Sequence, residues 1–392
     1  LYSRARVCQR QGKKQESRPA GGCLSCLGKT QRSAQMNKFG IRFSFSTFGE
    51  SHGAGIGCLV DGVPAGLKID EEFIQSELDR RKPGQNEFAT ARKEADRVEI
   101  LSGTFEGLST GTPIAMVIYN TNQKSKDYTN IKDIFRPGHA DFTYWHKYGI
   151  RDYRGGGRSS ARETAARVAA GAVAKLMIKE VGIEVQSGII EIAGIRSETH
   201  DFDYVSSSEI YTLDKNAEEA QKAAILEAKT RHDSVGGAAL VKIKGAPIGL
   251  GEPLYYKLDA LLAEAMMGIN AVKAVEIGDG MRSSQTTGAT NNDPIKADRF
   301  VSNHAGGILG GISNGEDIDV SVYFKPTPSI FIEQETIDTH NTEQHFSLKG
   351  RHDPCVAIRG SVVAESMAAL VIADMLLLNM GRKMDGVKNY YN

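Results

Sequence analysis

The chain has 392 residues, of which 40% are apolar and 24% charged, and its 48 Lys and Arg residues balance 48 Asp and Glu residues. This composition is typical of a globular protein and excludes a collagen-like or wholly disordered chain, and its neutrality argues against a nucleic-acid partner. The longest apolar run, Met367–Leu378, contains Asp374 and is far shorter than the roughly 20 residues of a membrane span, so no membrane partner is expected either.

Residues 1–35 differ from the rest of the chain in charge. They hold eight Lys and Arg residues and one acid, Glu16, which gives 8 − 1 = +7 and leaves −7 for residues 36–392. The segment begins at Leu1, lacks apolar periodicity and precedes Met36. We interpret it as an expression-derived or upstream-translated extension that is disordered and outside the fold. A transit peptide and a basic arm for a polyanion are the alternatives.

Three of the five cysteines, Cys8, Cys23 and Cys26, lie in this extension. The spacing of Cys23 and Cys26 is that of a redox pair or half a zinc site, but no second pair completes such a site. We therefore favour incidental thiols, and no metal site is predicted. With Cys58 and Cys355 alone in residues 36–392, no disulfide framework is implied, and a reducing, cytoplasmic location is predicted.

From Met36 the chain alternates strand-like and helix-like patterns. Asp70 precedes a pattern that places Phe73, Ile74 and Leu78 on one helical face, and basic residues followed by Pro-Gly end it near residues 80–84. A helix is therefore predicted over this segment. The apolar run at 114–119 then predicts a buried strand.

The clearest helix is predicted over residues 160–182, where small and apolar residues recur at helical spacing. Ser160 and Glu163 have the spacing of a capping box at its start. Further helices are predicted over residues 215–230, 258–269 and 361–380, and alternation over residues 318–324 predicts a half-buried strand.

No Ser- or Pro-rich linker divides residues 36–392, so they are predicted to form one interlocked α+β unit. The segments His52–Gly57 and His304–Gly310 are faintly alike. This likeness indicates either an internal duplication of two similar halves or chance similarity between Gly-rich loops.

Glycines cluster in loops at 49–57, 155–157, 278–280 and 306–315. At residues 154–163 such a loop, with several arginines and two serines, precedes a predicted helix start. Free backbone N–H groups, the helix dipole and the guanidinium groups all favour an anion there. The segment matches neither the Walker A motif nor the GxGxxG fingerprint.

Three loops place a histidine among small and basic residues. They are the loops around His52, His139 and His352. Histidine exchanges protons near neutral pH, so three such loops suggest one site assembled from distant segments. A fourth segment follows the predicted strand at 318–324, where Lys325, Thr327 and Ser329 alternate with prolines and form a predicted polar clamp.

Five of these segments together resemble the chorismate synthase family. They are Gly49–Gly53, Arg136–Asp141, Arg154–Glu163, Ser302–Gly311 and Gly350–Cys355, and the resemblance covers about residues 39–378. It implies a β-α-β sandwich and a cytosolic homotetramer. It also implies a lyase that converts 5-enolpyruvylshikimate 3-phosphate to chorismate and phosphate by 1,4-elimination, with reduced FMN and no net oxidation.

The resemblance also implies the site residues. Substrate binding is assigned to Ser51, Arg80, Arg81, Arg136 and Arg162, and FMN binding to Arg158, Ser159, Ser160, Asn270, Ala271, Gly310, Lys325, Pro326, Thr327, Pro328, Ser329 and Arg351. Catalysis is assigned to His52, His139 and Asp353. His52 is expected to protonate the departing phosphate or the flavin N1 region. His139 is expected to maintain the charge state of phosphate or flavin, and Asp353 to assist flavin N5 in taking the substrate proton.

One position departs from the family pattern. Some members carry a basic residue where this chain has Glu87, which puts a full basic clamp in doubt unless Arg92 compensates. Some members also make their own reduced FMN from NADPH, so a flavin reductase is the second hypothesis, although no GxGxxG strand–turn–helix is present. A polyanion-binding scaffold is the non-enzyme alternative, and the −7 charge of residues 36–392 argues against it.

Overall fold

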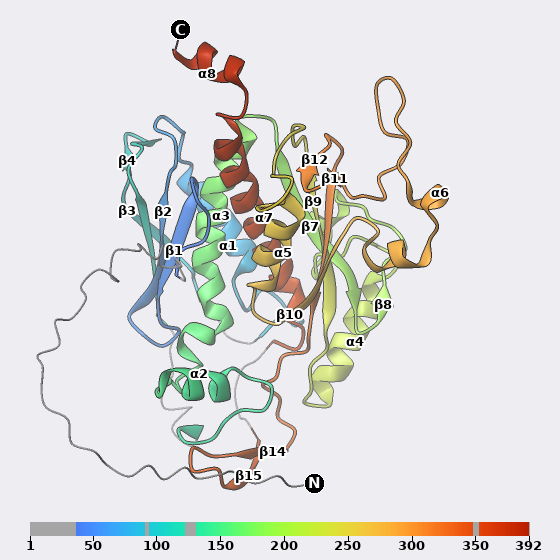
Figure 1. The fold of residues 1–392 in the computed structure, drawn as a ribbon. Coiled ribbons are helices and arrows are strands. Elements are labelled where there is room, and N and C mark those ends of the chain that lie inside the picture. The colour runs from blue at the N-terminus through green and yellow to red at the C-terminus, as the bar shows by residue number, and fades with distance from the viewer. Residues whose placement is uncertain (1–36, 91–93, 122–130, 348–352, 392) are drawn as a thin grey trace, which may run out of the picture. The chain divides into compact units, whose positions relative to one another are not determined.

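Two antiparallel sheets enclose a layer of helices in the part of the chain that the structure, a computed structural model, describes (Figure 1). The described residues are 37–90, 94–121, 131–347 and 353–391. The chain divides into two units, Leu1–Met36 and Asn37–Asn392, and only the second is described here. The predictions for residues 1–35, for Arg92 and for Arg351 lie outside the described residues.

The first sheet has the strand order β1-β2-β6-β3 and the second the order β10-β13-β9-β7-β8. The first contains β1 (Ser44–Gly49), β2 (Gly55–Asp61), β3 (Val98–Ser102) and β6 (Ile114–Tyr119). The second contains β7 (Glu184–Ile192), β8 (Ile195–Arg196), β9 (Gly237–Lys244), β10 (Val272–Ile277) and β13 (Ile318–Phe324). The strands predicted over 114–119 and 318–324 are confirmed.

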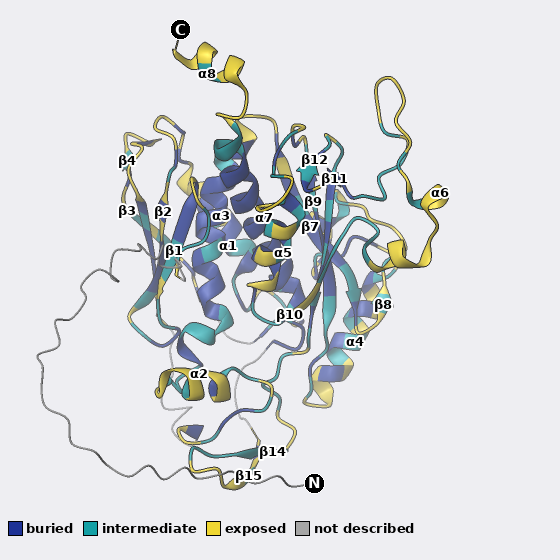
Figure 2. Cartoon of the chain, viewed as in Figure 1, coloured by how far each residue is buried: buried dark blue, intermediate teal, exposed yellow. Residues whose placement is uncertain are grey.

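The helix layer consists of α1 (Glu71–Arg81), α3 (Thr164–Lys179), α5 (Leu258–Met267) and α7 (Ala357–Asn379). Helix α3 packs against β2 of the first sheet, α7 packs against β7 and β9 of the second, and the two helices pack against each other. Buried residues concentrate in this layer and on the sheet faces that cover it (Figure 2). The predicted α+β sandwich is therefore confirmed.

Shorter helices and strands complete the described fold. The helices among them are α2 (Asp141–Tyr148), α4 (Glu218–Thr230), α6 (Gly288–Asn291) and α8 (Met384–Tyr391). The strands form three hairpins: β4 (Thr104–Phe105) with β5 (Leu108–Ser109), β11 (Ile308–Leu309) with β12 (Ile312–Ser313), and β14 (Gln334–Ile337) with β15 (Glu343–Phe346).

Helix α1 forms where it was predicted. The Asp70 side chain accepts a hydrogen bond from the backbone N–H of Phe73, which satisfies a free donor at the helix start. Ile74 and Leu78 are fully buried on one face, and Lys82, with extended backbone before Pro83, ends the helix.

Helix α3 also forms, but its predicted capping box does not. Two one-turn 3-10 helices, Gly157–Ser159 and Ala161–Glu163, precede it. The Ser160 hydroxyl accepts from the backbone N–H of Arg162, while the Glu163 carboxylate accepts from the Thr47 hydroxyl and from Arg167. The capping box is wrong because Glu163 is committed to these partners on β1 and on its own helix.

Helix α7 is the longest apolar helix among the described residues. It has 23 residues, and by length and composition alone it could cross a bilayer, which the 12-residue run in the sequence had not indicated. However, 83% of the most apolar 18-residue stretch of this helix is buried inside the fold. Packing against α3 and the second sheet therefore accounts for its apolar character.

The two halves of the described unit share one topology. In the first half β1, β2, α1, β3, β6 and α3 follow in chain order, and in the second β7, β9, α5, β10, β13 and α7 do, with the same strand neighbours. The correspondence extends to individual hydrogen bonds. Ser109 accepts from Leu67 N–H and donates to the Pro64 carbonyl, and Ser313 makes the same two bonds with Leu250 and Pro247.

This repeat supports an internal duplication, but in another register than the predicted one. Hairpin β11–β12 corresponds to hairpin β4–β5, because each joins the third and fourth strands of its half. The segment His304–Gly310 therefore corresponds to residues just before β5, and not to His52–Gly57, which leads into β2. The likeness of those two Gly-rich segments is a coincidence of loop composition.

Candidate active site

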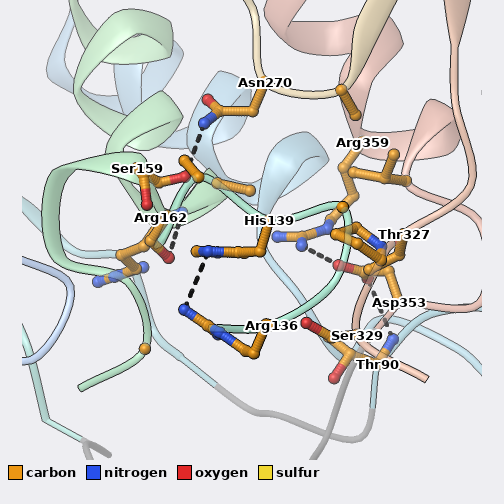
Figure 3. A pocket seen from close by; sticks show the side chains of 18 of the residues that line it. Thr90, Arg136, His139, Ser159, Arg162, Asn270, Thr327, Ser329, Asp353 and Arg359 are labelled. Atoms are coloured by element: carbon orange, nitrogen blue, oxygen red, sulfur yellow. Dashed lines mark hydrogen bonds and ion pairs between the residues drawn. The ribbon is translucent and has the colours of Figure 1, made fainter. Parts of the chain in front are cut away.

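A cavity of about 310 Å³ lies at the end of the sandwich where α3 and α7 begin. Segments from across the chain line it, and Figure 3 shows their side chains converging. The predicted residues that line it are His52, Arg81, Arg136, His139, Ser159, Ser160, Arg162, Asn270, Ala271, Lys325, Thr327, Pro328, Ser329 and Asp353. The expectation that distant loops assemble one site is therefore met for these residues.

Among the other predicted residues, Arg80 faces away from the cavity. Consecutive residues of a helix are rotated by about 100°, so Arg80 and Arg81 cannot share a face of α1. Arg80 instead pairs with Glu77 and Glu365, at 2.8 Å in each case, beside a second cavity of about 800 Å³. Its assignment to substrate binding is not supported by this placement.

Three further predicted FMN residues lie outside the lining. Arg158 donates to the backbone carbonyl of Gly49 and to Thr47, so its guanidinium ties the loop before α3 to β1. Gly310 lies in the turn of the β11–β12 hairpin. This hairpin precedes the first residue of β13, whereas Lys325 follows the last one, so the two residues lie near opposite ends of the strand. Pro326 joins two lining residues without lining the cavity itself.

The departure at Glu87 lies outside the cavity too. The residue is exposed, and its backbone carbonyl accepts from Lys229. The cation beside Glu87 is therefore Lys229, and neither residue lines the cavity. Thr90, three residues further on, does line the cavity.

The glycines at 155–157 allow two imidazole side chains to approach the backbone closely. All three have positive φ, which strains any residue with a Cβ atom. A Cβ on Gly155 would lie 2.2 Å from His52 Cε1, and one on Gly156 would lie 2.8 Å from His139 Cε1. The tripeptide is thus shaped around the two imidazoles.

His139 lies between a donor and an acceptor. Its Nδ1 is 3.1 Å from Arg136 Nη2 and 3.1 Å from Asp141 Oδ1. A guanidinium can only donate and a carboxylate can only accept. Nδ1 therefore accepts from Arg136 when it carries no proton and donates to Asp141 when it carries one. Burial lowers the pKa of His139; Arg136 adds to this and Asp141 opposes it. Near neutral pH, His139 is therefore mainly neutral and accepts from Arg136.

The tautomer of His52 follows from its neighbour. The Ser51 hydroxyl lies 3.1 Å from His52 Nδ1 and donates to the Arg154 carbonyl at 3.3 Å. Because a hydroxyl has one proton, His52 Nδ1 must then carry a proton and donate to Ser51. Ser51 therefore lies behind His52 and orients its ring.

Arg359 is a cavity residue that the sequence patterns did not reveal. It lies in the first turn of α7 and pairs with Asp353, which also accepts from the backbone N–H of Thr90 at 3.4 Å (Figure 3). The one available signal was a basic residue two positions before Ser361, where the last helix was predicted to begin. It was missed because that helix begins at Ala357 rather than Ser361.

Four buried polar atoms of the cavity residues have no hydrogen-bond partner among the described residues. They are Arg162 Nη2, Asn270 Oδ1, Thr327 Oγ1 and Arg359 Nε. Leaving a buried polar atom unpaired costs about 1–3 kcal/mol, so such atoms gathered in one cavity indicate a polar ligand.

The cavity also carries excess positive charge. Five described lining residues are cations: Arg81, Arg136, Arg162, Lys325 and Arg359. Three carboxylates pair with them, namely Asp96, Asp141 and Asp353. The N-termini of α3 and α7 add their dipoles at the same end. The arrangement suits a ligand with several negative charges.

The two cysteines of the described unit take no part in this chemistry. Cys58 and Cys355 are buried, and burial raises the pKa of each thiol to about 12. Neither thiol forms a thiolate nucleophile near neutral pH.

The fold and cavity thus define an α+β sandwich whose one end suits a polyanionic small molecule beside two imidazoles. The chorismate synthase family model matches residues 43–377. Chorismate synthase of Sulfurimonas denitrificans is 75% identical over 356 residues, which cover 91% of this chain and 99% of the relative, and that of Helicobacter hepaticus is 63% identical with the same coverage. A crystal structure of chorismate synthase, 32% identical, superimposes with a TM-score of 0.71 over 90% of this chain and 97% of its own.

The chain belongs to the chorismate synthase family.

Proposed function

We propose that this chain catalyses the 1,4-elimination of phosphate from 5-enolpyruvylshikimate 3-phosphate to give chorismate, the last common step of aromatic amino acid biosynthesis. The substrate carries two carboxylates and a phosphate. The observation that carries the proposal is the cationic cavity, in which two buried guanidinium nitrogens, Arg162 Nη2 and Arg359 Nε, have no hydrogen-bond partner among the described residues. Family membership over residues 43–377 supports the reaction.

The lining also fits a flavin mononucleotide. Ala271, Val356 and Pro328 provide apolar surface for a ring system, and Asn270 Oδ1 is a buried acceptor without a partner among the described residues. The Ser160 hydroxyl, before the start of α3, accepts from the Arg162 N–H and can donate its own proton to a phosphate, whereas the Ser159 hydroxyl donates to the Gly156 carbonyl at 2.7 Å. Reduced FMN, when bound, would supply electron density transiently to the allylic system.

Arg81, Arg136 and Arg162 would hold the anionic groups of the substrate. All three side chains are almost fully buried, at 1%, 3% and 3% exposure. Bonds between ions are strong where water is excluded, and the planar guanidinium matches carboxylate and phosphate geometry. These arginines would both orient the ring and stabilise the charge that develops on the leaving phosphate.

His139 and His52 would manage protons at the leaving group and at the cofactor. The neutral His139 beside Arg136 can accept a proton, after which Nδ1 would turn its bond from Arg136 to Asp141. His52, with a proton fixed on Nδ1, presents Nε2 as its second proton-exchanging atom. A positioned acid or base of this kind contributes about 10²- to 10⁴-fold in rate.

Asp353 would assist removal of the substrate proton. The elimination breaks one C–H and one C–O bond, shifts the ring double bond and adds a second C=C bond, so one proton and one phosphate are lost overall. Arg359 pairs with Asp353 and keeps the carboxylate at the cavity wall. Arg359 is therefore proposed as the residue that orients Asp353, with its Nε–H directed to a ligand.

The test is an anaerobic assay with 5-enolpyruvylshikimate 3-phosphate and chemically reduced FMN. The proposal expects chorismate and phosphate in equal amounts, with no product when FMN is left out or oxidised. A protein that binds the substrate but leaves it unchanged under these conditions would refute the proposed activity. A parallel reaction with FMN and NADPH as the only reductant tests the flavin reductase hypothesis.

We further propose a cytoplasmic homotetramer. On the outer face of the first sheet Phe48, Leu59 and Tyr119 are 46%, 42% and 51% exposed. Phe48 covers Gly57, and pairing across β1, β2 and β6 puts these side chains on one face. An apolar sheet face of this kind suits contact with another copy. Sedimentation of the purified protein measures the assembly.

A further inference from the structure

A single carboxylate lies between two of the proposed substrate-binding arginines. Asp96 lies two residues before β3, and its side chain is fully buried. Its Oδ2 accepts from Arg81 Nη1 at 2.9 Å, and its Oδ1 accepts from Arg162 Nη1. Arg81 comes from α1 and Arg162 from the turn before α3, so Asp96 joins two walls of the cavity.

The remaining contacts fix both guanidinium groups in one orientation. Arg81 Nη2 donates to the Ala161 carbonyl at 2.9 Å and its Nε to the Thr164 hydroxyl at 3.2 Å. Arg162 Nε donates to Asn120 at 3.1 Å. What is left is Arg162 Nη2, which is buried and has no hydrogen-bond partner among the described residues. Asp96 on Nη1 and Asn120 on Nε together fix the direction of that donor.

The backbone at Asp96 is itself unusual. Its φ is +47°, a left-handed conformation that costs a non-glycine residue about 1 kcal/mol or more. Asn and Asp tolerate it best, yet a fully buried carboxylate here also needs ionic partners. A strained backbone conformation that is held in place by two ion pairs is typical of a functional site rather than of an ordinary turn.

The charges around Asp96 do not balance without a ligand. Burial alone would raise the pKa of Asp96, but Arg81 and Arg162, with Arg359 nearby, hold it below its usual range. Burial lowers the pKa of Arg81 to about 9, and Arg359 and Arg162 add to this effect. Asp141 is shared in a similar way, by Arg136 at 2.7 Å and by Arg151 at 3.3 Å. One anion shared by two buried cations leaves room for an anionic group of the substrate.

We propose that Asp96 is a positioning residue, which fixes Arg81 and Arg162 in the orientation that the substrate's anionic groups require and leaves their combined charge half neutralised. This inference rests on the proposed function and adds a residue to it. Asp96 acts through the two arginines, and it does not line the cavity.

Two variants separate orientation from charge. Asp96→Glu keeps the charge and moves the carboxylate by one methylene, whereas Asp96→Asn nearly keeps the shape and removes the charge. Asp79→Asn is the matched control, because Asp79 is a 45% exposed acid on α1 that pairs with Lys82. For each protein, kcat/KM for the substrate is measured with reduced FMN, together with the inhibition constant of inorganic phosphate and the melting temperature.

Phosphate is the informative probe because a small anion needs charge more than a fixed arrangement of donors. Misplacing a positioning group by about 1 Å costs about 100-fold in rate, so Asp96→Glu is expected to lose at least about tenfold in kcat/KM. Its phosphate inhibition constant is expected to stay within about threefold of that of the wild type, by the same reasoning. Asp96→Asn is expected to lose kcat/KM while binding phosphate as tightly as the wild type or more tightly, because the cavity gains positive charge.

Three results would overturn the inference. Wild-type kcat/KM in Asp96→Glu would mean that orientation is not needed. Tighter binding of both substrate and phosphate in Asp96→Asn would show that Asp96 acts only through its charge and does not orient the arginines. Parallel loss of kcat/KM, phosphate binding and melting temperature in Asp96→Asn would make it a folding residue. Failure of the proposed function is distinct, since the wild-type protein itself would then form no chorismate.

Discussion

Replacing Gly155 with alanine should displace His52 without removing a polar group. Gly155 has a φ of +64°, and a Cβ atom there would lie 2.2 Å from His52 Cε1 and 2.4 Å from Nδ1. Ordinary contacts begin at about 3.4 Å, so the ring must move by 3.4 − 2.2 = 1.2 Å if the loop stays in place. A shift of about 1 Å at a catalytic group costs about 100-fold in rate, which corresponds to about 2.7 kcal/mol of transition-state stabilisation.

Gly182→Ala is the matched control. Gly182 has a φ of +78°, and a Cβ atom there would meet nothing within 4 Å. Both variants carry the same cost of left-handed alanine, about 1–2 kcal/mol. The two should therefore lose similar amounts of thermal stability, whereas only Gly155→Ala should lose about 100-fold in kcat/KM in the anaerobic assay.

The reasoning is refuted in either of two ways. Equal kcat/KM in the two variants would show that the close approach of Gly155 and His52 does not matter for catalysis. A much lower melting temperature in Gly155→Ala than in Gly182→Ala would show that the loss of activity reflects folding. Circular dichroism melting curves on the assayed samples separate these cases.

Further substitutions test individual residues of the site. His52→Ala and His139→Ala should each slow turnover at least about tenfold and leave the far-ultraviolet spectrum unchanged, and wild-type turnover in both would remove the imidazoles from the chemistry. Because burial holds the pKa of His139 below its unfolded value of 6.5, the folded state binds fewer protons and loses stability as pH falls through the folded pKa. His139→Gln should therefore lose less melting temperature than the wild type between about pH 7.5 and about pH 5.5, and equal losses would contradict the shift. Arg359→Lys keeps the charge but loses the Nε–H, so substrate affinity or turnover should fall about tenfold, and unchanged kinetics would show that this donor holds no ligand.

The elements were predictable where one physical signal dominates. Asp70 and the apolar face of Ile74 and Leu78 gave both the start and the side of α1. The start of α7 was placed late because Ala357 and Ile358 carry no capping signal, and the helix begins without a side-chain cap. The capping box at Ser160 failed for a related reason: Glu163 forms bonds to Thr47, 116 residues earlier, and local spacing cannot reveal such a partner.

The site was predictable as a set of motifs rather than as geometry. Glycine beside histidine and arginine indicated the loops that meet at the cavity, since close approach to an imidazole requires a residue without Cβ. Arg80 was grouped with Arg81 because the two are adjacent in sequence, whereas helical rotation sends them to different cavities. Asp96 and Arg359 lie outside the recognisable motifs, so only their contacts reveal them.

The duplicated topology explains why the site forms at this end of the molecule. Each half ends in a long central helix, α3 or α7, and both helices begin at the same cavity. The segments that precede them carry Ser159 to Arg162 in one half and Asp353 in the other. Two helix N-termini therefore face one ligand space, and the arginines of both halves reinforce their field.

The most direct measurement is a crystal structure of the protein with FMN and 5-enolpyruvylshikimate 3-phosphate bound. The account predicts both ligands in the cavity between the starts of α3 and α7, with anionic groups within hydrogen-bond distance of Arg162 Nη2 and Arg359 Nε. Either ligand bound instead in the second cavity beside Arg80, with those two donors still unpaired, would contradict it.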